Sequence, residues 1–139
     1  MEKFILIPVF VQVLLTSIVM IVMGRRRIRA AKNKEISVSA FKTMNLTGAN
    51  EQVIATSRNF DNQFQMPMLY LFSVLFTLQF GLADLAYVIL GALYVLLRVL
   101  HSLIHIGSNK VRLRFNVFLF SCVVLWGIWL RLLVQLFLA

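Results

Sequence analysis

The chain has 139 residues, 60% of them apolar, with 14 Lys and Arg against 5 Asp and Glu, which gives a formal net charge of +9. The length allows one domain, but the apolar content excludes an ordinary soluble protein. The charge does not predict a nucleic-acid partner, because the basic residues are concentrated between long apolar segments instead of covering a polar surface. The composition therefore predicts an all-α integral membrane protein.

The first apolar segment, FILIPVFVQVLLTSIVMIVM, covers residues 4–23. At about 1.5 Å per residue, a helix of this length crosses a hydrocarbon core of about 30 Å. A cleaved signal peptide is the alternative. Only Lys3 precedes the segment, Glu2 offsets its charge, and the basic cluster RRRIR follows it. We expect the first membrane-spanning helix over residues 4–24.

Three further spans follow from the same pattern. A basic connector over 25–57 precedes a second span over 58–80, whose helix begins near Arg58 because the apolar run 66–80 is too short to cross alone. A third span over 84–106 starts at Asp84, a favourable N-cap residue. A short basic connector, 107–114, leads to a fourth span over 115–138. Residues 1–139 thus form a single transmembrane domain.

The connectors also predict the orientation. Lys and Arg are retained on the cytoplasmic side of a membrane, and both basic connectors lie on the same side of a four-span chain. We expect a multi-pass protein with both termini on the non-cytoplasmic side, in the inner membrane if the source is bacterial.

Ionisable and amide side chains inside the second and third spans need an explanation, because charged groups are costly in a bilayer. On the second span, Arg58, Asn62 and Gln65 follow one another at i, i+4 and i+7. On the third, a similar stripe consists of Tyr94, Arg98, His101 and His105. Both stripes lie towards the cytoplasmic end, so we expect them to line one polar cavity, with Arg112 and Arg114 over its mouth.

Such a cavity suits a small polyanionic ligand, because guanidinium groups form paired hydrogen bonds with carboxylates and phosphates. Two alternatives stay open. Arg58, Arg112 and Arg114 can serve as interfacial contacts to anionic lipid. Arg98 can pair with Asp61 or with a helix-end carbonyl. His101 and His105 have the i, i+4 spacing of metal ligands, but no third ligand is near in the sequence, and we expect no metal.

The segment RNFDNQFQMPMLY, residues 58–70, resembles the second-helix signature of the MAPEG proteins, the membrane-associated proteins in eicosanoid and glutathione metabolism. In that family an Arg, then an Asn, then a Glu precede a Pro and an apolar run. The matching residues here are Arg58, Asn62, Gln65 and Pro67. The four short spans, the basic connectors and the third-span segment YVLLRVLHSLIH also agree, so the resemblance, to a divergent bacterial-type member, covers essentially the whole chain.

The resemblance implies a left-handed four-helix bundle assembled as a homotrimer, with glutathione as co-substrate bound between subunits near the cytoplasmic face. It implies a glutathione transferase or peroxidase that acts on a lipophilic small molecule among membrane lipids. Carried over residue by residue, the glutathione-binding positions are Arg58, Asn62, Gln65, Arg98, His101, His105, Arg114 and one of the first-helix arginines, Arg25, Arg26 or Arg27. Arg112 matches the arginine that stabilises the thiolate, and Arg114 competes for that role.

Two departures from the family pattern favour an alternative. Gln65 replaces a glutamate that pairs with the ammonium group of glutathione, and His101 and His105 replace tyrosines. The alternative is a non-catalytic membrane protein that binds a lipid headgroup or another small anion in the same inter-subunit cavity. A purely structural oligomer is a third hypothesis. No Ser/His/Asp set or phosphate-binding loop is present, so catalysis would use the thiol of the ligand.

Overall fold

The computed structural model describes residues 2–137, and in this part of the chain helices are joined by short connectors, with no strand. The elements in chain order are α1 (Glu2–Lys32), the short 3-10 helix η1 (Val38–Lys42), α2 (Glu51–Asn62), α3 (Met66–Gln79), α4 (Leu85–Ile106) and α5 (Val111–Phe137). The expected all-α fold is therefore confirmed.

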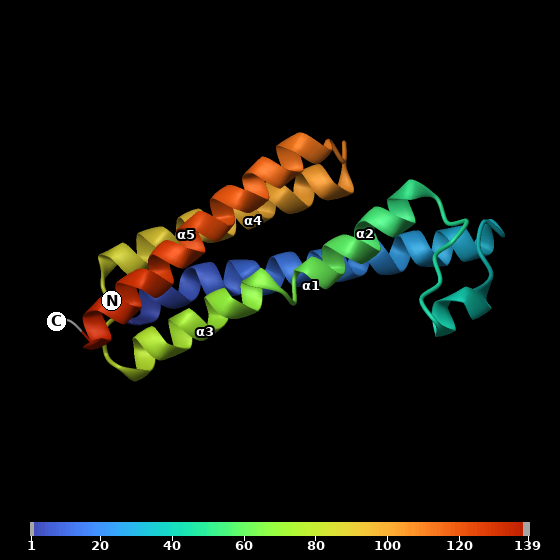
Figure 1. Ribbon diagram of the computed structural model, residues 1–139. Helices are drawn as coiled ribbons and strands as arrows, with labels where there is room; N and C mark the ends of the chain where they lie inside the picture. Colours follow the sequence, from blue (N-terminus) through green and yellow to red (C-terminus); the bar gives the residue numbers. More distant parts are fainter. Residues whose placement is uncertain (1, 138–139) are drawn as a thin grey trace.

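The long helices run side by side, and the connections gather at two ends (Figure 1). Both termini and the α3–α4 connection lie at one end, which we call the outer end. The α1–α2 connector and the α4–α5 turn lie towards the other, which we call the basic end because the basic residues of 25–57 and 107–114 are there. Helices α2 and α3 follow one another along α1, and α4 and α5 form an antiparallel hairpin.

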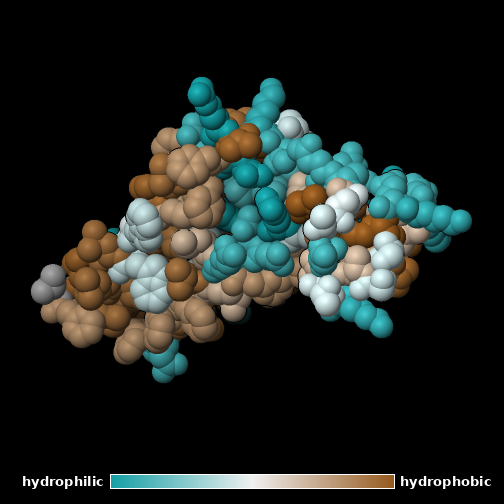
Figure 2. Space-filling view, turned by 45° about the vertical axis from the view of Figure 1, so that its right-hand side comes forward, coloured by the Kyte–Doolittle hydropathy of each residue, from teal (hydrophilic) through white to brown (hydrophobic). Residues whose placement is uncertain are grey.

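Three helices, α1, α4 and α5, are long and apolar enough to cross a membrane. Large apolar side chains such as Phe10, Phe120 and Leu130 are exposed on the outside, while Gln12, Asn59 and Arg98 are buried. Figure 2 shows this distribution on one face, where the outer end is almost wholly hydrophobic and the basic end is mixed. An apolar exterior around a partly polar interior is the arrangement that a bilayer favours.

Helix α1 is longer than the span expected from hydropathy. It continues from the apolar segment through the arginine cluster to Lys32 without a break, because Arg, Ala and Lys are good helix formers. Helix α5 likewise begins at Val111, four residues before the expected start of the fourth span at Phe115. In both cases the change between apolar and basic residues was a poor guide to the helix boundary, which is the end of α1 and the start of α5.

The single helix expected over 58–80 is instead two helices. Helix α2 begins at Glu51 under the side-chain cap of Asn50, and ends at Asn62. Helix α3 begins at Met66, with Pro67 in its first turn. Proline has no backbone N–H to donate to the carbonyl four residues earlier, here that of Gln63, so the helical hydrogen bonding stops between the two helices. Together α2 and α3 extend along the bundle from one end to the other (Figure 1).

The core contains two stacked tyrosines where α3 meets α4. The rings of Tyr70 and Tyr94 have their centroids 4.8 Å apart, and both side chains are buried. Gly91, one turn before Tyr94, leaves room for the end of the Tyr70 side chain, because a Cβ there would lie 2.7 Å from the Tyr70 hydroxyl oxygen. The Tyr70 side chain of α3 is thus accommodated against α4.

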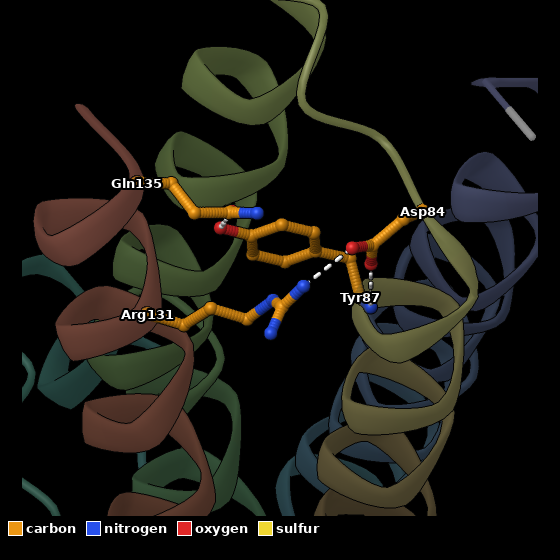
Figure 3. Close-up of polar contacts among 4 residues, drawn as sticks. All are labelled: Asp84, Tyr87, Arg131 and Gln135. Atoms are coloured by element: carbon orange, nitrogen blue, oxygen red, sulfur yellow. Dashed lines mark hydrogen bonds and ion pairs between the residues drawn. The ribbon is translucent and has the colours of Figure 1, made fainter. Parts of the chain in front are cut away.

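At the outer end, a cluster of polar side chains joins α4 to α5 (Figure 3). The predicted N-cap at Asp84 is confirmed, since its side chain accepts a hydrogen bond from the backbone N–H of Tyr87. The same carboxylate forms an ion pair with Arg131 of α5. The Tyr87 hydroxyl donates to Gln135 Oε1 at 2.6 Å, and the Arg131 guanidinium lies 5.1 Å from the Tyr87 ring centroid.

Candidate functional site

A polar cleft lies at the basic end, between the first turns of α2 and the α4–α5 turn. It encloses a cavity of about 350 Å³ lined by Ala49, Glu51, Ile54, Ala55, Arg58, His105, Asn109 and Arg114. An adjoining cavity of about 450 Å³ shares Arg58 and Ile54 and reaches Asp61. The cleft brings together three residues that the sequence predicted for one site: Arg58, His105 and Arg114.

The α4–α5 turn positions Arg114 in this cleft. Asn109, which has a positive φ of 48°, accepts a hydrogen bond from Arg114 Nη1 on its side-chain oxygen. Its side-chain nitrogen donates to Glu51 Oε1 at 2.9 Å, which ties the turn to the start of α2. Arg114 Nη1 also lies 3.4 Å from His105 Nε2. The guanidinium is therefore held at the side of the cleft, beside the imidazole.

The stripe predicted on the third span is present on α4: Tyr94, Arg98, His101 and His105 are all buried. His101 Nδ1 lies 3.2 Å from the Arg114 carbonyl oxygen, so this nitrogen carries the proton and donates it in a hydrogen bond. His101 Nε2 and His105 Nδ1 are buried and have no hydrogen-bond partner among the described residues. The two rings are 5.7 Å apart.

Arg98 is the most unusual residue of the stripe, because its side chain is completely buried. Its Nη2 donates to the backbone carbonyl of Asn62 at 3.4 Å, the helix-end carbonyl that was one of the two predicted partners; the other, Asp61, forms no ion pair within residues 2–137. Nε and Nη1 have no hydrogen-bond partner within residues 2–137, and the guanidinium carbon lies 5.8 Å from the centroid of the Phe118 ring. A buried guanidinium without a counter-charge is costly.

The predicted second-helix set is only partly assembled. Asn62 is half-buried at the last position of α2, and Arg58 is exposed one turn earlier. Gln65 is exposed and precedes α3 without a side-chain cap bond. The expectation that all three share one continuous helical face is wrong for Gln65, because α2 ends before it.

The remaining predicted residues lie outside this cleft. Arg112 and Arg25 are exposed, and neither lines the cavity. Of the three first-helix candidates, Arg26 and Arg27 form the contacts: Arg26 donates to the carbonyl of Ile106 at 3.3 Å, and Arg27 Nη2 donates to Ser57 Oγ at 2.9 Å. These bonds join α1 to α4 and α2.

A buried amide network beside the helix break was not predicted. Gln12 Nε2 of α1 donates to Gln63 Oε1 at 3.0 Å, and Gln63 Nε2 donates to Ser102 Oγ of α4 at 3.2 Å. Ser102 in turn donates to Asn59 Oδ1 of α2. One sequence signal was available, since Gln12 is the only amide in the first apolar segment. Polar groups between helices in a membrane strengthen their association.

Within residues 2–137, no group of three or more His, Cys, Asp or Glu side chains is arranged to hold a metal ion. The guanidinium groups of Arg58 and Arg114, which line the cleft, are suited to an anion, whereas the unpaired nitrogens of Arg98 are buried and do not line it.

The sequence pattern of the MAPEG family matches residues 5–134 of this chain. Neither a search of curated proteins nor a search of solved structures found a match. The family match extends from the first turn of α1 to the last turn of α5.

Proposed function

Because the chain belongs to the MAPEG family, whose members are membrane proteins that generally use glutathione, we propose that it is a glutathione-dependent transferase or peroxidase acting on lipophilic substrates. The observation that carries this proposal is the convergence of Arg58, His105 and Arg114 on one cleft at the basic end. Glutathione has two carboxylates, an ammonium group and a thiol, so a cleft rich in arginine suits most of its charges.

The unpaired polar atoms of α4 support an anionic ligand. Arg98 Nε and Nη1, His101 Nε2 and His105 Nδ1 are buried and unpartnered in the chain alone. The Arg98 nitrogens are donors, whereas His101 Nε2 is an acceptor because the proton is on Nδ1. Buried polar atoms of both kinds are normally satisfied in the working protein. In our proposal Arg58, Arg98 and Arg114 bind the carboxylates, and His101 and His105 contribute neutral hydrogen bonds. Asn62 and Gln65 are ligands expected from the family pattern.

The ammonium group needs a partner other than Gln65, which is neutral. Glu51 is the carboxylate that lines the cleft containing Arg58, and Asp61 lines the adjoining cavity. We assign the ammonium group to Glu51, since it is held near the cleft by its hydrogen bond from Asn109.

The chemistry requires the thiolate form of the ligand. A free thiol is mostly protonated at neutral pH, and an adjacent guanidinium lowers its pKa. Arg112 is the catalytic residue expected from the resemblance, and Arg114, which lines the cleft, is its competitor. The lipophilic substrate reaches the site laterally from the bilayer.

The exposed residues support placing the complete site between subunits. Arg112, Gln65 and Arg25 are exposed in the single chain, as residues at a subunit interface are before assembly. We therefore include in the proposal a homotrimer of left-handed four-helix bundles, in which α2 and α3 together form the fourth crossing. The basic end faces the cytoplasm, with both termini on the other side.

The ultraviolet absorbance of bound thiolate tests this proposal. Wild-type protein in detergent, mixed with glutathione at neutral pH, should show thiolate absorbance, because a guanidinium stabilises the anion. Either Arg112→Gln or Arg114→Gln should remove it, and the affected variant identifies the catalytic arginine. Thiolate absorbance that survives in both single variants and in the double variant would contradict the role given to these residues.

The alternative is a non-catalytic protein that holds a lipid headgroup or another small anion in the same cavity. The neutral Gln65 favours it, since a phosphate needs no carboxylate partner. A co-purified lipid that glutathione cannot displace would support this second function.

A further inference from the structure

A second hollow at the basic end is apolar and lies between the last turns of α1 and η1. It has a volume of about 450 Å³ and is lined by Gly24, Arg27, Ile28, Ala31, Lys32, Val38 and Phe41. We call it the α1–η1 groove. It shares no lining residue with the cleft that contains Arg58 and Arg114.

The groove lies at the level where a membrane span ends. Arg26 of α1 donates to the backbone carbonyl of Ile106, the last residue of α4, at 3.3 Å. The end of the candidate span Leu85–Ile106 is therefore level with Arg26. The groove begins at Gly24, just after the apolar segment of α1, and extends past this level to Lys32. In a bilayer this is the depth of the lipid headgroups and the first part of the acyl chains.

The groove carries positive charge that no carboxylate balances. Arg27 and Lys32 line it, and no Asp or Glu is among its lining residues. Arg27 contacts neutral groups: it donates to the Ser57 hydroxyl, and its guanidinium lies 5.7 Å from the centroid of the Phe41 ring. Neither cation forms an ion pair within the described residues 2–137. The groove is therefore complementary to an anion.

Its margins expose large apolar side chains. Ile28 is 59% exposed and Val38 is 73% exposed, although both lie beyond the apolar segment of α1. Figure 2 shows hydrophobic atoms interspersed with hydrophilic ones at the basic end. Contact with an acyl chain would remove these side chains from water, which is favourable. Unbalanced cations beside exposed aliphatic groups at headgroup depth suit one molecule that is both anionic and apolar.

We propose that the α1–η1 groove is a binding site for an anionic phospholipid. Lys32 and Arg27 bind the phosphate region, and the upper acyl chain lies along Ile28, Val38 and Phe41. A soluble anion would leave the aliphatic side chains exposed, and a zwitterionic lipid would leave the net charge unbalanced. This site is separate from the proposed glutathione site and does not depend on it.

Lipid retention measured by native mass spectrometry tests the proposal. Detergent-solubilised protein is titrated with phosphatidylglycerol and, separately, with phosphatidylcholine. Wild-type protein should retain phosphatidylglycerol preferentially. Lys32→Gln should weaken this retention about fivefold, the factor expected from the loss of one basic group near an anionic lipid. Lys110→Gln, which removes the same charge outside the groove, is the matched control and should have little effect.

A second pair of variants tests the apolar lining. Val38→Asp should weaken phosphatidylglycerol retention, whereas Val111→Asp, at an exposed apolar position of the basic end that lines neither the groove nor the polar cleft, should not. Both positions are on the surface, so folding should be preserved. Equal effects of Lys32→Gln and Lys110→Gln would overturn the proposal, because they would indicate attraction by net charge alone. The proposal would also be overturned if the wild-type protein formed oligomers without bound lipid and Val38→Asp dissociated them. A second copy of the chain would then occupy the groove.

Discussion

Arg98 shows most clearly how a single residue connects the fold to the proposed ligand. It is fully buried, it retains one long hydrogen bond to a carbonyl freed at the end of α2, and two of its nitrogens are unpaired. Stability alone gives no reason for such a group, since an apolar side chain of the same size would pack there without desolvation cost. A bound carboxylate would satisfy the guanidinium.

Replacing Arg98 with Met should therefore separate stability from binding. Without ligand, Arg98→Met should unfold in detergent at a temperature equal to or above that of the wild type, because the buried charge is gone. Glutathione should bind the variant at least about tenfold more weakly, since hydrogen bonds to charged groups contribute roughly 1.5–3 kcal/mol. Thermal unfolding with and without glutathione measures both. A clearly less stable variant with unchanged affinity would assign Arg98 a structural role only.

Asp84, which precedes the candidate span Leu85–Ile106, provides a pH-dependent prediction at the outer end. Burial alone would raise the pKa of its carboxyl, but hydrogen bonds from the Tyr87 backbone and the Arg131 guanidinium outweigh burial and hold that pKa below its usual value. The stability contributed by the ionised carboxylate is therefore present above the unfolded-state pKa of about 3.9 and is lost as the pH falls through the folded-state pKa.

Asp84→Asn should isolate the ion pair, because Asn is also a good N-cap residue. Both partners are partly exposed, so the variant should lose only about 0.5–1 kcal/mol of unfolding free energy at neutral pH. The difference from wild type should shrink as the pH falls below about 4. Thermal unfolding in detergent across this pH range provides the measurement, and a difference that persists in acid would show that charge is not its cause.

At the scale of helices, the contact of the Tyr70 side chain of α3 with α4 depends on Gly91. A methyl group there would lie 2.7 Å from the Tyr70 hydroxyl oxygen, but 3.4 Å from the nearest ring atoms. Gly91→Ala should thus cost about 1–3 kcal/mol of unfolding free energy through overpacking. Tyr70→Phe in the same chain should restore most of it, since it removes the closest atom. Comparing the two single variants with the double variant tests this. If Tyr70→Phe did not restore the stability lost in Gly91→Ala, the Tyr70 hydroxyl would not be the atom with which the added methyl group clashes.

The sequence predicted α4 better than it predicted α2 and α3. In α4, the spacing of Tyr94, Arg98 and His105 within an apolar helix indicates one buried face, and the structure has that face. In residues 58–66, the i, i+4, i+7 spacing of Arg58, Asn62 and Gln65 predicted one continuous helix, so the break before Pro67 was not evident. Pro67 is compatible with a kink in a helix that continues and also with the first turn of a new helix. The structure shows the break, because α2 ends at Asn62 and α3 begins only at Met66.

The candidate site was predictable in its cations but not in its other members. Long basic residues near the ends of spans stand out against apolar surroundings, as Arg58 and Arg114 do. Glu51 and Asn109 are 58 residues apart in the sequence, and a hydrogen bond joins their side chains in the fold. No local pattern predicts such a contact. The end of α1 was also misjudged, because hydropathy indicates where a membrane ends and not where a helix ends.

At the scale of the whole molecule, the basic residues that give the net charge of +9 fall into two groups with different proposed roles. One group lies in connectors at the basic end, where it predicts orientation and, at the α1–η1 groove, lipid binding. Of the rest, Arg58 and Arg114 line one polar cleft, and Arg98 is buried inside a molecule with an apolar exterior. One end of the molecule thus contains both proposed sites, and the outer end serves stability.

Glutathione binding to the purified protein, measured by titration calorimetry in detergent, tests the central claim most directly. The account predicts saturable binding that Arg58→Ala weakens at least about tenfold, through loss of a charged hydrogen bond. The control Arg29→Ala, which removes an exposed arginine of α1, should bind like the wild type. Absence of binding at millimolar glutathione, or equal affinities for wild type and Arg58→Ala, would contradict the claim that this cleft is a glutathione site.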